Sequence, residues 1–247
     1  MELKNKVALI TGGTHGIGAG ITIRLAKQGV QLCIVSRNLN KTKIFEDLDL
    51  LGVKYHKISA DLSKKDECER VVQETVDFFG GLDIIIHAAG AAAPGGLLTG
   101  ADLVWDQAFN LHVHAVFHLC LAAVPYMQNS SEGAIILISS SAGLRGVKNA
   151  LAYSVVKGAL PQFTRSLAFE LSDWNIRVNC VSPGVIRTRF QEYLSGEQVS
   201  NNINNRIPLH REGDVDDVGE VIEMLVKSDF ITGENVVVDG GMSMRIV

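Results

Sequence analysis

VALITGGTHGIG, residues 7–18, decides the fold of this chain. Its first four residues are all apolar, which is typical of a strand buried on both faces. The glycines then open a segment with Ile17, Ile21 and Leu25 at intervals of four, the spacing of one helix face. A glycine-rich turn between a strand and a helix lets a phosphate reach free backbone N–H groups. The stretch therefore predicts the first unit of a nucleotide-binding α/β fold.

The same alternation of apolar runs and amphipathic segments continues along the whole chain. Seven strands are predicted, at Val7–Ile10, Gln31–Val35, Val53–Ile58, Leu82–Ile86, Ala134–Ile138, Ile176–Val181 and Asn235–Val238. Helices are predicted at Ile17–Gln28, Asn40–Leu51, Lys64–Phe79, Asp102–Met127, Leu151–Leu171 and Val215–Val226. We expect one α/β domain, residues 1–247, with a Rossmann-type doubly wound parallel sheet and helices on both faces. A long irregular stretch, Pro183 to about Arg211 with a weak helix at Phe190–Leu194, is predicted to form a substrate loop around 184–211.

The composition narrows the class of protein. A hydrophobic share of 47% fits a globular domain with a large core, and a net charge of −4 provides no broad basic surface for nucleic acid. The four cysteines form no C-x-x-C pair, so we expect buried free thiols. The apolar stretch near the N-terminus is too short for a signal peptide or a membrane span. We expect a cytoplasmic protein with neither nucleic acid nor membrane as a partner.

The end of the second predicted strand bears on the choice of cofactor. A carboxylate there would bind the ribose hydroxyls of NAD, whereas this chain has Ser36 and Arg37. Arg37 can bind a 2′-phosphate through two charge-assisted hydrogen bonds, Ser36 can donate another, and His15 in the glycine turn can face the same phosphate. We therefore favour NADP(H) over NAD(H). A solvated Arg37 and a purely structural glycine turn are the alternatives.

Two residues of the long helix at Leu151–Leu171 suggest acid/base chemistry. Tyr153 and Lys157 are four residues apart, which places them on one helix face. A tyrosine, with a reference pKa of about 10, needs a nearby ammonium if it is to exchange a proton near neutral pH. The spacing alone is common by chance, but Ser139, Ser140 and Ser141 follow a predicted central strand, at the edge where α/β sheets bind ligands. These residues predict proton transfer to or from a carbonyl or alcohol.

Several pieces together resemble the single-domain short-chain dehydrogenase/reductase family, including its 3-oxoacyl reductases, over nearly the whole chain. The pieces are Thr11–Gly18, Ala60–Leu62, His87–Gly90, Ser140, Tyr153 with Lys157, Asn179 with Pro183–Gly184 and Thr188, Ile231–Gly233 and Asp239–Gly241. The resemblance implies that Ser140, 13 residues before Tyr153, orients the carbonyl, and that Ser139 and Ser141 are structural. It implies cofactor contacts for Gly12, Thr14, His15, Gly16, Ile17, Gly18, Ser36, Arg37, Asp61, Leu62, Ala88, Ala89, Gly90, Tyr153, Lys157, Pro183, Gly184, Ile186 and Thr188.

Two histidines stand where the family pattern has asparagines. The family's N-N-A-G reads His87-Ala88-Ala89-Gly90 here, which we expect to be tolerated. Counted from Phe117 and Pro125, the catalytic asparagine of the family falls on His112; a shift in register would place it on Asn110 instead. In the family this asparagine positions a water behind the lysine. We expect His112 to bind that water or to titrate and relay the proton.

The resemblance implies an NADP(H)-dependent reductase that interconverts a ketone and a secondary alcohol, and a homotetramer or homodimer joined through the long helices. The substrate could be a 3-oxoacyl, steroid or small carbonyl compound, in an apolar pocket of Trp105, Leu144, Val147, Phe190 and Tyr193. A catalytically weakened NADP-binding sensor or scaffold is the alternative function. His112, His114 and His118 have a metal-like spacing, but the sequence supplies no further ligand, so no metal is expected.

Overall fold

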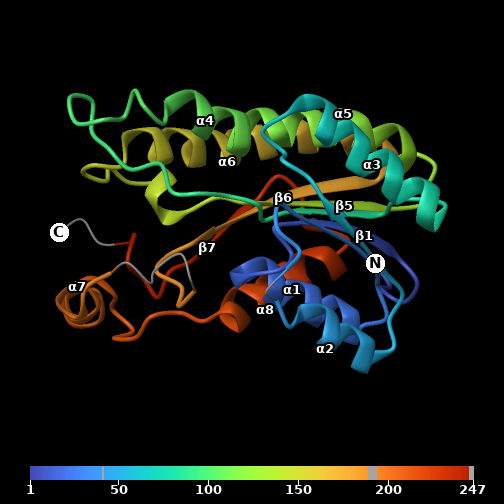
Figure 1. Cartoon of the computed structure of the whole chain (residues 1–247), viewed down its shortest axis with the longest axis horizontal. Coiled ribbons are helices and arrows are strands. Elements are labelled where there is room, and N and C mark those ends of the chain that lie inside the picture. Colours follow the sequence, from blue (N-terminus) through green and yellow to red (C-terminus); the bar gives the residue numbers. More distant parts are fainter. Residues whose placement is uncertain (41, 189–193, 245–247) are drawn as a thin grey trace.

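The computed structural model describes residues 1–40, 42–188 and 194–244 (Figure 1). Its centre is a seven-stranded sheet in which every neighbouring pair of strands is parallel. The strands are β1 (Val7–Thr11), β2 (Gln31–Ser36), β3 (Tyr55–Ser59), β4 (Ile84–His87), β5 (Gly133–Ile138), β6 (Ile176–Pro183) and β7 (Asn235–Val238). The order β3-β2-β1-β4-β5-β6-β7 reverses direction between β1 and β4. The predicted doubly wound Rossmann-type fold is therefore confirmed.

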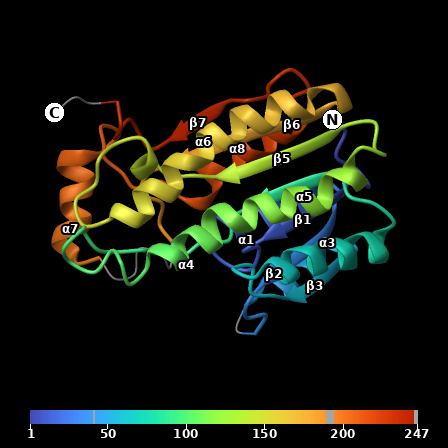
Figure 2. The same ribbon diagram turned by 90° about the horizontal axis from the view of Figure 1, so that it is seen from above.

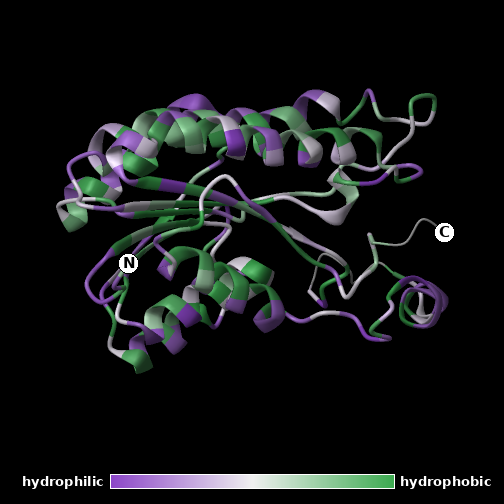
Figure 3. Cartoon of the chain, turned by 180° about the vertical axis from the view of Figure 1, so that it is seen from behind, coloured by the Kyte–Doolittle hydropathy of each residue, from purple (hydrophilic) through white to green (hydrophobic). Residues whose placement is uncertain are grey.

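Helices cover both faces of this sheet (Figures 1 and 2). They are α1 (Gly16–Lys27), α2 (Ile44–Leu51), α3 (Lys65–Phe79), α4 (Trp105–Phe109), α5 (Ala115–Met127), α6 (Leu151–Leu171), α7 (Gly196–Asn201) and α8 (Val215–Lys227). Figure 1 shows α3, α4, α5 and α6 on one face and α1, α2 and α8 on the other. Hydrophilic and hydrophobic residues alternate along these helices, as expected where each helix has one buried face (Figure 3).

The core lies in two layers, one on each side of the sheet. All residues of β5 and β6 are buried, because helices cover both of their faces. Successive side chains of a strand point to opposite faces, so Ile135 packs in the layer beneath α3, α5 and α6, and Ile136 packs in the layer beneath α1 and α8. This two-sided burial explains why the strands are apolar at consecutive positions.

The structure corrects two expectations about local structure. The segment predicted as one helix, Asp102–Met127, begins at Trp105 and contains a π-helical turn, Asn110–His114, between α4 and α5. The stretch predicted as irregular contains α7 and a second π-helical turn, Asn202–Arg206. A capping box between Ser195 and Gln198 starts α7, and this signal was readable in the sequence. The helix predicted at Phe190–Leu194 lies almost entirely outside the described residues.

Two further features concern the apolar residues. All four cysteines are buried and free, as predicted. By length and composition the helical segment Trp105–Met127 is apolar enough to cross a membrane, a test that core helices of soluble proteins also pass. Leu119 and Ala123 of this segment are fully buried in the layer that also contains α3, which accounts for its apolar character.

Candidate active site

A cavity of about 1030 Å³ opens at the carboxyl ends of the strands, where the strand order reverses. Open α/β sheets bind their ligands at this place. All the site residues predicted from the sequence line the cavity except Asp61. The Asp61 carboxylate instead accepts hydrogen bonds from Ser63, which lower its pKa more than the nearby charges of Lys64 and Arg37 do. Ala60 and Leu62 line the cavity on either side of it.

The glycine turn after β1 is shaped to receive a bound group. Gly12 has φ of +67°, and a Cβ at this residue would lie 2.8 Å from the backbone nitrogen of Ala89. Only glycine fits this approach of the turn to the segment after β4. Helix α1 then begins at Gly16 without a side-chain cap and without an acid in its first turn. Its N-terminal N–H groups are thus available to a pyrophosphate, so the turn fits a dinucleotide.

Hydroxyl groups connect this turn to the end of β2. Thr14 Oγ1 donates to Ser36 Oγ at 3.0 Å and lies 2.9 Å from Nδ1 of His15. Ser36 and the exposed Arg37 both line the cavity at this point. The Ser36 hydroxyl and the Arg37 guanidinium therefore lie at the end of β2, where we expect the adenosine ribose of the cofactor.

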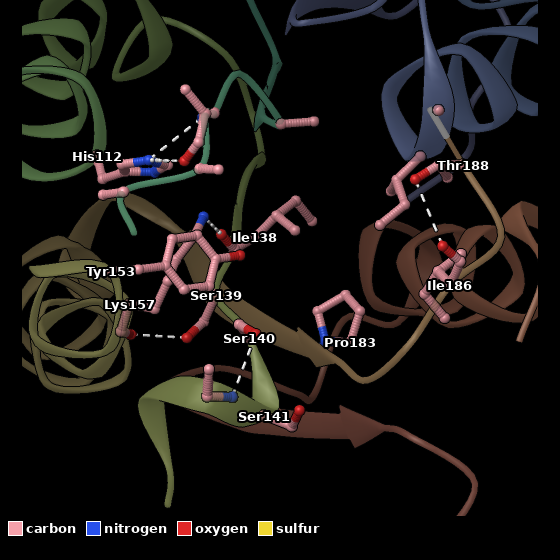
Figure 4. A pocket seen from close by; sticks show the side chains of 18 of the residues that line it. His112, Ile138, Ser139, Ser140, Ser141, Tyr153, Lys157, Pro183, Ile186 and Thr188 are labelled. Carbon is pink, nitrogen blue, oxygen red and sulfur yellow. Dashed lines mark hydrogen bonds between the residues drawn. The ribbon is translucent and has the colours of Figure 1, made fainter. Parts of the chain in front are cut away.

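Tyr153 and Lys157 lie one turn apart on α6 and both reach the cavity (Figure 4). Lys157 Nζ lies 5.8 Å from the centroid of the Tyr153 ring and donates a hydrogen bond of 2.7 Å to the carbonyl oxygen of Ile138. Lys157 is only 5% exposed, and burial lowers its pKa to about 8. The ammonium form therefore still predominates at neutral pH.

The three serines after β5 have different environments (Figure 4). Ser140 is half-buried in the cavity lining, and its Oγ accepts a hydrogen bond of 3.2 Å from the backbone of Ala142. Ser139 is buried and donates to the carbonyl oxygen of Lys157 at 2.7 Å, which ties β5 to α6. Ser141 is buried at the start of a 3-10 helix, Ser141–Gly143. Ser139 and Ser141 line the cavity as well, so the structural role that the resemblance implied for them stays a prediction.

The π-helical turn at Asn110–His114 places His112 beside the tyrosine. The His112 ring meets the Tyr153 ring edge-on, with centroids 6.0 Å apart. His112 Nε2 lies 3.0 Å from the carbonyl oxygen of Ala91, and its buried Nδ1 has no hydrogen-bond partner among the described residues. Asn110 does not line the cavity; its side chain bonds to His114. Within the described ranges no group of three or more His, Cys, Asp or Glu residues could hold a metal ion.

Burial keeps both substituted histidines neutral. For His112, burial first and the charge of Lys157 second lower the pKa to about 3, so the expected titration near neutral pH is wrong. The same two causes lower the pKa of His87 to about 3. His87 Nδ1 lies 3.0 Å from Oγ1 of Thr11, which also accepts a hydrogen bond from the backbone of Ala89.

The predicted apolar substrate pocket is wrong for Trp105 and Leu144. Of its residues only Val147 is among the described lining; Phe190 and Tyr193 lie outside the described residues. Leu144 lies outside the lining, and Trp105 packs against Phe109 with ring centroids 5.1 Å apart. The lining also contains polar and basic side chains that were not singled out from the sequence: Arg145, Lys148, Asn149, Gln198, Asn202 and Arg206.

Known proteins resemble this chain along its whole length. A family model described as enoyl-(acyl carrier protein) reductase matches residues 12–243. Dehydrogenase/reductase SDR family member 4 of Sus scrofa is 34% identical over 255 residues, which cover 99% of this chain and 89% of that protein. The chain belongs to the short-chain dehydrogenase/reductase family. The 3-oxoacyl-[acyl-carrier-protein] reductase FabG of Chlamydia muridarum is another similar member, 31% identical over 245 residues, or 98% of each chain.

Solved structures of short-chain dehydrogenases/reductases agree with the fold. L-sorbose reductase from Gluconobacter frateurii, complexed with NADPH and L-sorbose, matches with a TM-score of 0.92, 28% identity and 100% coverage of both chains. The 3-oxoacyl-[acyl-carrier protein] reductase from Brucella melitensis, in complex with NAD, also has a TM-score of 0.92, with 29% identity over 99% of both chains. The protein is thus an oxidoreductase of a family that uses nicotinamide cofactors and small-molecule substrates, and whose members typically form oligomers.

Proposed function

We propose that this short-chain dehydrogenase/reductase uses NADP(H) to interconvert a ketone and a secondary alcohol. The observation that supports this most is the meeting of Ser140, Tyr153 and Lys157 in one cavity, beside the uncapped N-terminus of α1. When bound, the reduced nicotinamide supplies the hydride. The side chains of this chain supply the rest of the chemistry, namely the orientation of the carbonyl and the proton that the product oxygen must receive.

Tyr153 is the proposed general acid in the direction of reduction. Ser140 Oγ donates a hydrogen bond to the carbonyl oxygen, and Tyr153 gives its phenolic proton to that oxygen as negative charge develops there. The buried ammonium of Lys157 stabilises the phenolate that remains, and the carbonyl of Ile138 keeps this ammonium in place. In the direction of oxidation the same phenolate takes the proton from the alcohol.

His112 is the proposed end of the proton path behind Lys157. His112 Nε2 lies 3.0 Å from the carbonyl oxygen of Ala91 and 3.4 Å from its N–H, and the shorter contact assigns the proton to Nε2. A neutral His112 then presents Nδ1 as an acceptor on the side of Gly90 and Lys157. A water molecule between Nδ1 and the Lys157 ammonium would satisfy this orphaned nitrogen and link the lysine to solvent. His112 thus acts as a neutral acceptor that positions water and does not change charge in the neutral range.

Arg37 and Ser36 support NADP(H) over NAD(H). Both line the cavity at the end of β2, and no carboxylate lies among the described lining residues. Because similar solved structures contain either NADPH or NAD, the proposal rests on these two side chains. The four free thiols fit a reducing compartment, so we also propose a cytoplasmic location.

Exposed apolar side chains on α5 and α6 support assembly into a homodimer or homotetramer. Phe117 and Leu121, four residues apart on α5, are 49% and 58% exposed, and Phe169 on α6 is 85% exposed. Large apolar side chains that are exposed together on neighbouring helices mark contact surfaces. Light scattering should therefore give a mass that is a multiple of the chain's mass.

A panel of ketones assayed with NADPH and NADH side by side tests the proposal. We expect carbonyl-dependent oxidation of NADPH at a higher kcat/KM than that of NADH. Binding of NADPH without turnover of any ketone, and without oxidation of the corresponding alcohols with NADP⁺, would instead support the sensor or scaffold function.

A further inference from the structure

The charge of the cavity lining differs from the charge of the whole chain. The chain has 27 acidic and 23 basic residues, yet the described lining contains five lysines and arginines and no aspartate or glutamate. Two of these cations, Arg37 and Lys157, have roles in the proposed function. Arg145, Lys148 and Arg206 have none.

These three cations come from two segments that are far apart in the sequence. Arg145 and Lys148 lie in the segment between the 3-10 helix and α6, and Arg206 ends the π-helical turn after α7. Figure 2 shows α7 and the segment that leads into α6 at the same end of the molecule, beyond the carboxyl ends of the strands. The fold therefore brings positive charge from two segments to the lining of one cavity.

Arg206 is held in place by a buried side chain. Its Nη1 donates a hydrogen bond of 2.7 Å to Oδ1 of Asn202, which is only 4% exposed and itself lines the cavity. A guanidinium has five N–H donors in one plane, so this anchor leaves donors available for a further acceptor. Within the described residues no carboxylate forms an ion pair with Arg206, whereas Arg24, Arg70 and Arg211 all pair with carboxylates.

Lys148 and Arg145 add charge without competing partners. Both are exposed, and neither forms an ion pair with a described carboxylate. Arg145 donates only to the backbone carbonyl of its neighbour Leu144, at 2.9 Å. A recess lined by charges of one sign attracts ligands of the opposite sign and raises their rate of association. Gln198 and Asn149 supply neutral amides in the same lining.

We infer that the ketone substrate carries an anionic group, a carboxylate or a phosphate, at a distance from its carbonyl, and that Arg206 binds this group with help from Lys148 and Arg145. The inference rests on the proposed function, because it concerns the end of the same ketone substrate that lies away from the reacting carbonyl. The planar fork of Arg206 matches the two oxygens of a carboxylate or phosphate. Ser140 and Tyr153 then receive the carbonyl.

Two ketones that differ only in charge test the inference. 4-Acetylbenzoate carries a carboxylate opposite its ketone, and 4-acetylbenzamide replaces it by a neutral amide of similar shape. The wild type should reduce the carboxylate with a kcat/KM about tenfold higher, mainly through a lower KM. Arg206→Ala should remove this preference and leave the amide within about twofold of wild type. Equal efficiency for the two ketones in the wild type would overturn the inference. 4-Acetylphenyl phosphate shows whether phosphate is preferred to carboxylate.

Further variants separate the effect of the positive charge of Arg206 from an effect on folding. Arg206→Lys keeps a donor for Asn202 and should retain part of the preference, and Lys148→Ala should lower it without affecting Asn202. Lys65→Ala, which removes an exposed lysine of α3, should change nothing. A loss of turnover with both ketones in Arg206→Ala, together with a lower melting temperature, would assign Arg206 a structural role and overturn the inference.

A binding measurement keeps this inference separate from the proposed function. If wild type reduces neither of these two ketones, the ketone panel still decides the proposed function, and calorimetry with the NADPH-loaded protein tests the anion site by itself. Tighter binding of 4-acetylbenzoate than of the amide, abolished by Arg206→Ala, would support the site. Equal binding of the two compounds would overturn it.

Discussion

Lys157 Nζ is held 2.7 Å from the carbonyl oxygen of Ile138, the last residue of β5, and this bond fixes the ammonium 5.8 Å from the centre of the Tyr153 ring. Helix α6 sets the distance between Lys157 and Tyr153, and the carbonyl at the end of β5 holds the Lys157 ammonium. A buried ammonium that is hydrogen-bonded in this way remains charged at neutral pH, because burial lowers its pKa only to about 8. The arrangement places a positive charge beside the phenol without a carboxylate to neutralise it within the described lining.

Replacement of Lys157 by methionine should remove that charge and keep the fold. Methionine fills a similar volume and needs no hydrogen bonds, so the melting temperature should change little. The kcat/KM for ketone reduction should fall by about 10² to 10⁴. Steady-state assays of NADPH oxidation measure this. A variant within a few-fold of wild type would show that the lysine is not needed for proton transfer.

The pH dependence of the wild type provides a related prediction. As Lys157 loses its proton above its pKa of about 8, the phenolate of Tyr153 loses its stabilising charge, so kcat/KM for reduction should decline above about pH 8. A profile that stays flat through pH 9.5 would show that the ammonium of Lys157 does not control the step.

The two buried histidines should make the protein sensitive to acid. The pKa of both His87 and His112 is lowered to about 3 in the fold, against 6.5 for the free side chain. The unfolded chain therefore takes up protons below about pH 6.5 that the folded chain does not, and stability is lost as the pH falls from there towards 3. Urea unfolding at several pH values should show this, and a His87→Asn/His112→Asn double variant should lose less stability over that range. An equal loss in both proteins would contradict the burial argument.

His112→Asn alone tests the water-positioning role. It should lower kcat, or leave it similar if asparagine positions the same water, and in either case the activity profile between pH 6 and 8 should keep its shape. A titration in that range that disappears in the variant would mean that His112 does change charge.

The close approach of the 3-10 helix to α6 makes the stability of the protein sensitive to substitution at Gly143. A Cβ on Gly143 would lie 2.6 Å from the backbone carbonyl carbon of Lys157. Backbone atoms cannot rotate away, so Gly143→Ala should lower the free energy of unfolding by about 1–3 kcal/mol and displace Lys157. Gly81→Ala is the matched control, because a Cβ there meets nothing within 4 Å. Equal melting temperatures for the two variants would show that the contact is looser than described.

Arg37→Asp tests the cofactor preference. The new carboxylate would repel a 2′-phosphate and accept hydrogen bonds from ribose hydroxyls. The ratio of kcat/KM for NADPH to that for NADH should fall at least about tenfold. An unchanged ratio would show that Arg37 is a solvated surface charge.

Much of this structure could be predicted from local sequence patterns. Runs such as Ala134–Ile138 indicated strands because burial on both faces requires consecutive apolar residues, and α6 spans the predicted Leu151–Leu171. The 13-residue interval to Tyr153 that the family resemblance implied selected Ser140, which lines the cavity together with Ser139 and Ser141.

Features that depend on packing between distant segments could not be predicted. In the π-helical turn at Asn110–His114 the backbone hydrogen bonds shift to the next residue along the helix, and no residue type specifies this shift. Burial keeps His112 neutral, and its ring packs against Gly90, which is 22 residues away in sequence. Arg145 and Arg206 are 61 positions apart, and only the folded chain shows that they line one cavity.

Tyr153→Phe tests the central claim most directly. Phenylalanine keeps the ring and its packing beside His112 but has no proton to give. With saturating NADPH and a ketone that the wild type reduces, kcat/KM should fall by about 10² to 10⁴ while NADPH still binds with an unchanged dissociation constant. A Tyr153→Phe variant that reduces the ketone within a few-fold of wild type would show that another group supplies the proton.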